Sequence, residues 1–142
     1  MLESLFDGTD ILQKSLQGLT ARQRAIGENV ANSDTPGYKR VRVGFERELR
    51  DVIRGKQGHA DDLPLQTRDP RHFALGPSPL SLDDVNIDMT QVTDETFRAD
   101  GNNVDVEAEM ATLAETNVRY NTMATLAKNK FEGLKSLIRD IR

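Results

Sequence analysis

The organisation of this chain is decided by one stretch, Asn29-Val30-Ala31-Asn32-Ser33-Asp34-Thr35-Pro36-Gly37-Tyr38-Lys39-Arg40. It predicts the end of a helix followed by a fixed turn. Asn32 is of a type that can close a helix in the left-handed conformation, and Thr35 is biased away from helix because a proline follows it. The pair Pro36-Gly37 suits the central positions of a type II turn, after which the ring of Tyr38 can lie back on the helix. Turn chemistry alone also allows a tight turn with no further role.

Prolines divide the sequence into three parts. All five lie between residues 36 and 79, together with five of the ten glycines, whereas the flanks contain no proline. Because Pro and Gly interrupt regular elements, this distribution predicts an N-terminal helix in 1–35, an irregular middle in 36–102 and a C-terminal helix in 103–142. The first and last parts are expected to form one helical domain.

The first expected helix carries a seven-residue repeat. Apolar residues recur in two interleaved rows at alternating steps of three and four, which is the a/d spacing of a coiled-coil seam. One row is Leu5, Leu12, Leu19 and Ile26, and the other is Leu2, Thr9, Leu16, Gln23 and Val30. Gly8, Gly18 and Gly27 each weaken such a helix by about 1 kcal/mol relative to Ala, so we expect it to need a partner helix.

The last expected helix shows the repeat over more heptads. Asn103 or Asp105 is placed to cap its first turn. Acidic residues cluster at its start and basic residues toward its end, as the helix dipole favours. The two rows are Val106, Leu113, Tyr120, Ala127, Leu134 and Ile141, and Met110, Asn117, Ala124, Phe131 and Ile138.

These patterns predict a mainly α fold in which two long terminal helices pack as an antiparallel or crossing coiled-coil pair. An irregular or extended, β-containing middle segment connects them. The seams carry polar members, namely Thr9, Gln23 and Asn117. Such residues cost stability but can fix register and partner. We therefore expect exposed apolar surface in an isolated monomer, which marks an interaction site.

The middle segment contains shorter signals. Residues 39–43 alternate like a strand with one charged face, and a single short amphipathic helix follows, built on Phe45, Leu49, Val52 and Ile53. Residues 55–64 indicate a loop or disorder, and residues 71–75 indicate a short strand. An extended arm fits residues 76–100 better than a packed domain.

Composition excludes several classes of protein. The net charge of −4 argues against uniform attraction to nucleic acid. The absence of Cys excludes disulfides and thiolate metal sites. The N-terminus has no basic n-region or long apolar run, so a cleaved secretory signal is not expected. Residues 39–56 are basic and residues 81–109 acidic, so these segments either meet each other or form separate solvated surfaces.

No grouping of side chains predicts chemistry. His59 with Asp61 and Asp62 is the nearest approach to a metal cluster, but nothing in that polar loop would orient the ligands. Residues 83–88 indicate a solvated acidic face rather than paired catalytic carboxylates. No nucleophile elbow, phosphate loop or dinucleotide fingerprint occurs. The sequence therefore predicts a non-enzymatic assembly subunit without cofactor or metal.

The turn motif and the start of the last helix resemble those of the bacterial flagellar rod and hook axial proteins. The resemblance rests on the string Ala-Asn-x-x-Thr-Pro-Gly-Tyr-Lys at 31–39, on residues 101–114, and on the spacing of Asn117, Tyr120, Phe131, Leu134 and Ile138. The small size resembles the proximal rod members of that family. The resemblance assigns a role in the turn and in assembly to a set of residues at the end of the first helix. They are Asn29, Ala31, Asn32, Thr35, Pro36, Gly37, Tyr38 and Lys39.

The resemblance implies a structural role. Subunits of this family stack helically into an axial drive shaft that transmits torque and encloses an export channel. It implies copies of the chain, other rod proteins, a rod-to-membrane-ring adaptor and the flagellar type III export apparatus as partners. The expected location is the basal-body rod, which spans the periplasm, and it is reached without a cleaved signal. Phe45 and Leu49 resemble an element that engages the export gate; the alternative is that they bury one face of a short helix.

Other classes remain open at the level of sequence. Another small rod component of the same family is the nearest alternative. A cytoplasmic coiled-coil adaptor or export chaperone is the next, and it would stay inside the cell as a small oligomer. A periplasmic enzyme acting on the cell wall would need paired acidic groups in a cleft, which this pattern does not build.

Overall fold

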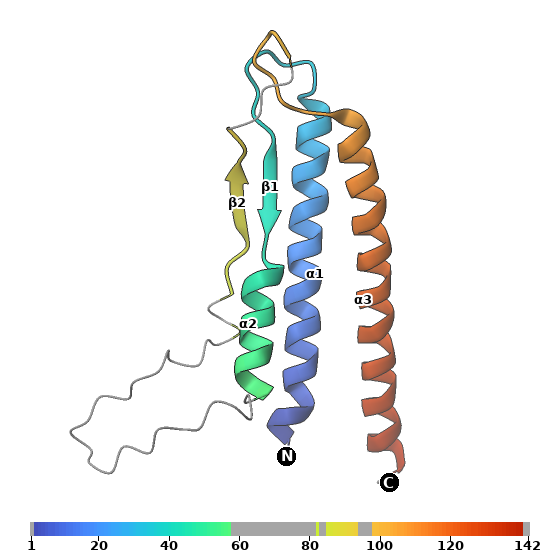
Figure 1. Cartoon of the computed structure of the whole chain (residues 1–142). Coiled ribbons are helices and arrows are strands. Elements are labelled where there is room, and N and C mark those ends of the chain that lie inside the picture. Colours follow the sequence, from blue (N-terminus) through green and yellow to red (C-terminus); the bar gives the residue numbers. More distant parts are fainter. Residues whose placement is uncertain (1, 58–81, 83–84, 94–97, 141–142) are drawn as a thin grey trace, which may run out of the picture.

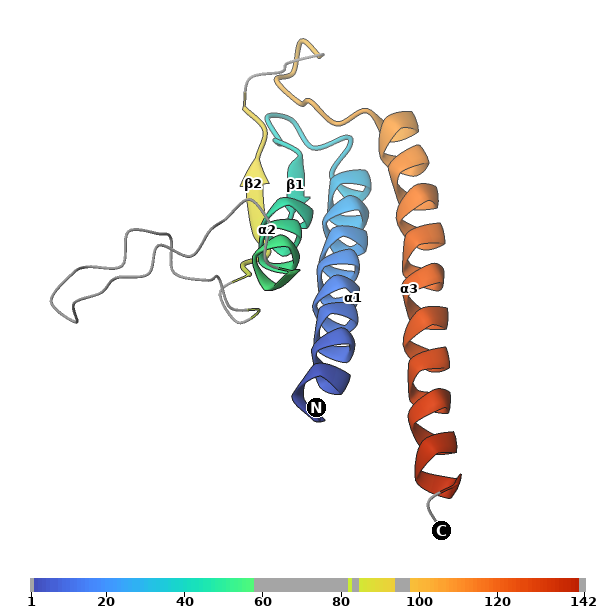
Figure 2. The same ribbon diagram turned by 60° about the horizontal axis from the view of Figure 1, so that its bottom comes forward.

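The frame of the protein is a hairpin of two long helices. The computed structural model describes residues 2–57, 82, 85–93 and 98–140. Helix α1 spans Leu2–Ala31 and helix α3 spans Val106–Asp140. They run side by side in opposite directions, so the beginning of α1 and the end of α3 lie at the same end of the molecule (Figures 1 and 2). The chain is therefore mainly helical, as predicted.

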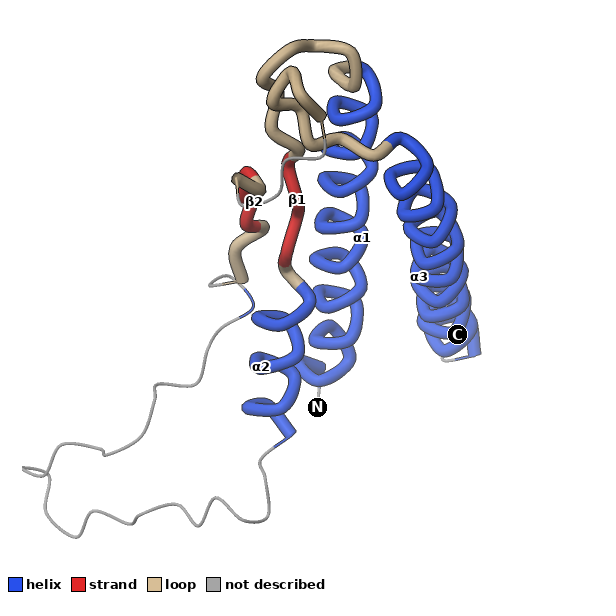
Figure 3. Tube along the Cα trace, turned by 45° about the horizontal axis from the view of Figure 1, so that its top comes forward, coloured by secondary structure: helices blue, strands red, loops and turns tan. Residues whose placement is uncertain are grey.

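The middle segment adds a small layer along α1, on the side away from α3 (Figure 3). It consists of strand β1 (Val41–Gly44), helix α2 (Glu46–Gln57) and strand β2 (Asp88–Gln91). The two strands pair antiparallel, with Val41 opposite Gln91 and Gly44 opposite Asp88. The short strand and the single amphipathic helix expected here are confirmed.

Two expectations for the middle differ from the structure. Helix α2 continues through Gln57, into the loop expected over 55–64, because Gly55 costs a helix only about 1 kcal/mol and Lys56 and Gln57 favour it. The arm expected over 76–100 is extended at β2, but it is also packed, since Val85 is buried in the core. Residues 58–64 and the strand expected at 71–75 lie outside the described residues.

The ends of the long helices follow local chemistry. The N–H of Asn32 donates to the carbonyls of Glu28 and Asn29, which closes α1. Asn32 itself is not left-handed, because in the described part of the chain only glycines have positive φ. At the other helix, Oδ1 of Asp105 accepts from the N–H groups of residues 107 and 108, and so caps α3.

The thickest part of the core lies between α1 and the middle layer, not between the two long helices. Its buried members come from α1, β1, α2 and the segment before β2, namely Leu19, Ala25, Val43, Phe45, Leu49, Val52 and Val85. Tyr120 and Met123 of α3 are only partly buried against this cluster. Burial of apolar surface is the main favourable term in folding, and in this cluster α1 contributes buried side chains whereas α3 contributes partly buried ones.

Helix α3 is rotated relative to the seam that the sequence predicts. The row that begins at Met110 was expected to face α1, yet Met110, Phe131 and Ile138 are 51%, 60% and 72% exposed. The buried positions Glu109 and Thr116 lie one residue earlier, which is a turn of about 100° around the helix. The carboxylate of Glu109 accepts a hydrogen bond from the side chain of Asn29 inside the molecule, at 3.1 Å. Much of the predicted seam of α3 therefore faces solvent.

Candidate assembly site

The closed end of the hairpin is held by three asparagines that are almost completely buried. The side-chain amide of Asn102 donates to the carbonyls of Asn32, Ser33 and Thr35 at 3.0, 3.0 and 2.9 Å. These carbonyls belong to the end of α1 and the turn that follows it. One side chain just before α3 thus satisfies three backbone acceptors that lie 67–70 residues away in sequence.

Asn29 uses both of its polar atoms to join α1 to three other parts of the chain. Its Nδ2 donates to the carbonyl of Val41 (2.9 Å) and to Oε2 of Glu109 (3.1 Å). Its Oδ1 accepts from the N–H of Val41 (2.8 Å) and from the hydroxyl of Tyr38 (3.2 Å). All four bonds that an amide side chain can readily make are used, so Asn29 fixes the start of β1 and the first turn of α3 on α1.

Asn103 extends the pairing of the two strands. Its Oδ1 accepts from the N–H of Arg40 at 2.7 Å, and its Nδ2 donates to the carbonyl of Val92 at 2.6 Å. The N–H of Val92 in turn donates to the carbonyl of Arg40. The side chain is 1% exposed. Sequence patterns indicated only a possible cap at this position, whereas its role here is to tie the sheet to the start of α3.

The turn after α1 is of type II, as predicted. The N–H of Tyr38 donates to the carbonyl of Thr35 at 3.3 Å, and Gly37 has φ of +74°, which that turn requires at its third position. The N–H of Gly37 then donates to the carbonyl of Asp100. Gly101 is also left-handed, with φ of +82°, and packs against Gly37. Two glycines therefore let the two halves of the chain cross closely.

Charged side chains surround this junction. Nζ of Lys39 donates to the carbonyl of Gly101 at 2.8 Å. Arg40 lies 3.9 Å from Glu109, which is the one place in the described residues where the basic and acidic segments form an ion pair. Burial raises the pKa of the Tyr38 hydroxyl, and the nearby carboxylates of residues 28 and 109 raise it further. Tyr38 therefore stays a neutral donor to Asn29.

A second fixed point lies where β1 leads into α2. The ring of Phe45 lies against the backbone of Gly18 on one side, and the guanidinium of Arg22 lies 5.3 Å from the ring centroid. Arg22 also donates to the carbonyl of Val43 (2.9 Å) and to Glu46 (2.7 Å). Phe45 and Leu49 are both buried in the core.

The remaining residues of the predicted seam lie in different environments. In α1, Leu19 and Ile26 are buried, while Leu12, Leu16 and Val30 are half-buried; the side chain of Leu5 lies outside the described part. In α3, Leu113, Tyr120 and Leu134 are half-buried, Val106 and Asn117 are exposed, and Ile141 lies outside the described residues. Nε2 of Gln23 donates to Oδ1 of Asn117 at 2.8 Å, a polar contact that joins the two expected seams.

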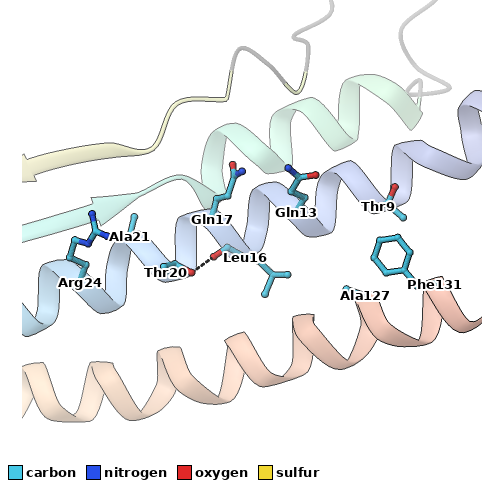
Figure 4. A pocket seen from close by; sticks show the side chains of 9 residues that line it. All are labelled: Thr9, Gln13, Leu16, Gln17, Thr20, Ala21, Arg24, Ala127 and Phe131. Carbon is cyan, nitrogen blue, oxygen red and sulfur yellow. Dashed lines mark hydrogen bonds between the residues drawn. The ribbon is translucent and has the colours of Figure 1, made fainter.

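A groove of about 590 Å³ runs along the outer face of α1 beside α3. Thr9, Gln13, Leu16 and Thr20 line it from α1, and Phe131 points toward it from α3 (Figure 4). Only one charged side chain, Arg24, lines it, with Gln17, Ala21 and Ala127 completing the wall. Apolar surface that is open to solvent in this way can receive a packed protein neighbour.

The described part of the chain contains no candidate metal centre. It contains no group of three or more His, Asp or Glu side chains that could hold a metal ion. The weak cluster of His59, Asp61 and Asp62 lies outside the described residues. Among the described residues, none of the helices has the length and apolar character that crossing a membrane requires.

These features define a class of structural protein: a helical hairpin locked at one end, with apolar side chains uncovered along its last helix. Comparison with known sequences names the family. The family described as "Flagella basal body rod protein" matches residues 12–39, which cover the last two thirds of α1 and the turn. The chain is 31% identical to the flagellar basal body rod protein FlgB of Bacillus subtilis over 136 residues, 95% of this chain and 96% of the relative.

Other relatives agree. The FlgB of Borreliella burgdorferi is 28% identical over 130 residues, 92% of this chain and 94% of the relative. The FlgB of Salmonella typhimurium is 26% identical over 142 residues, 97% of each chain. The chain belongs to the flagellar basal body rod protein family and, within it, to the FlgB proteins. It is a structural protein of the flagellar rod and not an enzyme.

Proposed function

We propose that this protein is a subunit of the proximal rod of the flagellar basal body, where it transmits torque and lines the export channel. The observation that carries the proposal is the uncovered apolar side chains at the two ends of α3, Val106 and Met110 near its start and Phe131 and Ile138 near its end. Single exposed apolar residues are normal on a monomer, but apolar side chains that group on the surface mark an interaction site. In the rod, neighbouring subunits cover these two groups.

The shape of the molecule suits a mechanical role. At 1.5 Å per residue, α1 and α3 are about 45 and 52 Å long, and their junction is fixed by buried side-chain amides rather than by a loop. Close-packed interiors are stiff and transmit strain. We infer that α1 and α3 complete a coiled-coil pairing only when neighbours pack against both.

The partners that follow from this role are copies of the chain, other rod proteins, an adaptor between rod and membrane ring, and the export apparatus. The residues of the turn motif act by holding the hairpin closed. Phe45 and Leu49 have a sufficient role in the core, because both are buried there. Because these two residues are buried, the export gate can engage them only in the unfolded chain. Export through a narrow channel also requires an unfolded chain.

The proposal is tested by deleting the gene in its host and restoring it in trans. We expect the deletion strain to lack rods in electron micrographs of basal bodies and to be non-motile, and the wild-type gene to restore both. A deletion strain that swims normally and assembles rods would refute the proposal. A strain that assembles rods but fails at a later stage of export would point to an adaptor or chaperone instead.

A further inference from the structure

A second groove, of about 430 Å³, lies between α1, α2 and α3. Its floor is apolar and is formed by Leu19, Phe45, Leu49, Ile53 and Met123. These residues come from all three helices, so the groove exists only when α2 is folded against the hairpin. An apolar groove between helices is the usual receptor for one face of another helix.

The rim of this groove is positively charged. Arg50, Arg54 and Arg119 line it, with Glu46 as the one acidic member among its lining residues. Glu46 already pairs with Arg22 at 2.6 Å and lies 3.6 Å from Arg119. No ion pair joins Arg50 or Arg54 to a carboxylate of the described residues, and both are exposed. The groove therefore selects an apolar segment that carries acidic side chains.

The chain itself presents such a segment at the start of α3. Val106 and Met110 are 40% and 51% exposed, and they lie on adjacent turns of one face. Asp105 and Glu107 flank them and are also exposed. The start of α3 therefore combines exposed apolar side chains with acidic side chains, and these acidic side chains form no ion pair with the described residues.

The two surfaces cannot meet within one molecule. Val106 and Met110 precede Arg119 and Met123 by thirteen residues each, which places them about 20 Å away along the helix and about 140° around it. The start of α3 thus faces one side of the hairpin, and the groove faces the opposite side. A contact between them joins two molecules head to tail, and a repeated contact of this kind builds an open helical array or a ring.

We propose that the arginine-rimmed groove of one copy receives the acidic start of α3 of a second copy. Met110 enters the apolar floor near Ile53, and Glu107 lies against Arg50 and Arg54. This inference rests on the proposed function, since it names the contact by which neighbouring subunits join. It assigns α2 a role as part of the receiving surface.

Cysteine cross-linking tests the contact directly, because the chain has no Cys of its own. Basal bodies are isolated from oxidised cells whose only copy carries Ile53→Cys and Met110→Cys. We expect disulfide-linked dimers and longer ladders, because a disulfide needs Cα atoms within about 7 Å. The matched control, Ile53→Cys with Leu126→Cys, places the second thiol on an exposed site of another face and should give no ladder. Absence of ladders from assembled rods, or equal ladders in the control, would overturn the proposal.

A charge exchange provides the second measurement if the cysteine variants assemble poorly. Arg54→Glu and Glu107→Lys should each reduce incorporation into rods several-fold, and the two together should restore it. Arg139→Glu, an exposed charge near the end of α3, is the matched control and should incorporate normally. Loss in both single variants without restoration in the double variant would show that Arg54 meets a different acidic partner, and it would overturn the contact between copies.

These outcomes are separable from a failure of the proposed function. If wild-type chain is found in rods but neither test gives the expected result, the rod assignment stands and the contact is wrong. If wild-type chain is absent from rods, the rod assignment fails, and the cross-linking ladder can still be sought in the purified full-length protein. A ladder there would support the contact, and its absence would refute it.

Discussion

Gly18 lies directly under the ring of Phe45, because a Cβ built at Gly18 would lie 2.6 Å from three carbons of that ring. No carbon fits at that distance without a shift of the ring or of the helix. The guanidinium of Arg22, one turn further along α1, also lies over this ring, 5.3 Å from its centroid. The packing of the middle layer on α1 thus depends on the absence of one methyl group.

Replacing Gly18 by Ala should therefore destabilise the protein, although Ala favours helix. We expect a loss of about 1–3 kcal/mol from overpacking, measured as the free energy of unfolding in urea. Gly27→Ala is the matched control, because Gly27 lies in the same helix and its added methyl carbon would meet no atom within 4 Å; it should gain about 1 kcal/mol. Equal effects of the two substitutions would show that Phe45 does not rest on α1.

The junction of the hairpin should depend strongly on Asn102. Asn102→Ala removes three hydrogen bonds, to the carbonyls of Asn32, Ser33 and Thr35, and each net hydrogen bond is worth about 1 kcal/mol. We expect the free energy of unfolding to fall by about 2–4 kcal/mol. The backbone amides at the end of α1 should also exchange their hydrogens faster. Asn121→Ala, at an exposed position of α3, should cost nothing measurable. A loss at Asn102 no larger than at Asn121 would contradict the role given to this side chain.

The type II turn makes a sharper prediction at Gly37. An L residue in the left-handed conformation costs about 1–2 kcal/mol, so Gly37→Ala should lower the free energy of unfolding by that amount even though open space surrounds the position. Gly44→Ala adds the same methyl group, also into open space, at a position whose φ is negative or extended. It should change stability little. Thermal unfolding of the two variants compares them directly.

Stability should also depend on pH through Glu46. Burial alone raises the pKa of this carboxyl, but the hydrogen bond and charge of Arg22, together with backbone N–H groups, lower it below the ordinary value of 4.5. A lowered pKa in the folded state means that the stabilisation is present above that ordinary value and is lost as the pH falls through the folded-state pKa. Glu46→Gln should therefore be less stable than wild type at neutral pH. The difference should shrink below about pH 4, and a difference that grows on acidification would contradict this assignment.

Much of the fold could be predicted from local chemistry. The confinement of proline to residues 36–79 predicted the three-part organisation, and the Pro-Gly pair predicted the turn, because both act through the backbone of a few adjacent residues. The strand and helix of the middle layer were visible from their periodicity. Asp105 was one of the two residues expected to cap α3, the other being Asn103, and it is the one that does so.

The contacts that lock the molecule could not be predicted, because they join distant residues. Asn102 is an ordinary turn residue by sequence, and its three acceptors lie almost seventy positions earlier. From the sequence, Gly18 is only a residue that weakens a helix. The structure shows that the ring of Phe45 packs against it. The rotation of α3 escaped prediction for a related reason. Periodicity finds a repeat of seven, but it does not reveal that the polar residues Glu109 and Thr116 are buried positions of α3.

The location of the protein in the cell tests its role in the rod most directly. An epitope-tagged copy is expressed in the deletion strain, motility is verified, and basal bodies are separated from cytosol and membranes. We expect the tagged chain to remain with purified basal bodies after extraction of the membrane, together with other rod proteins. A tagged chain that restores motility but is recovered only in the cytosol would contradict a structural role in the rod.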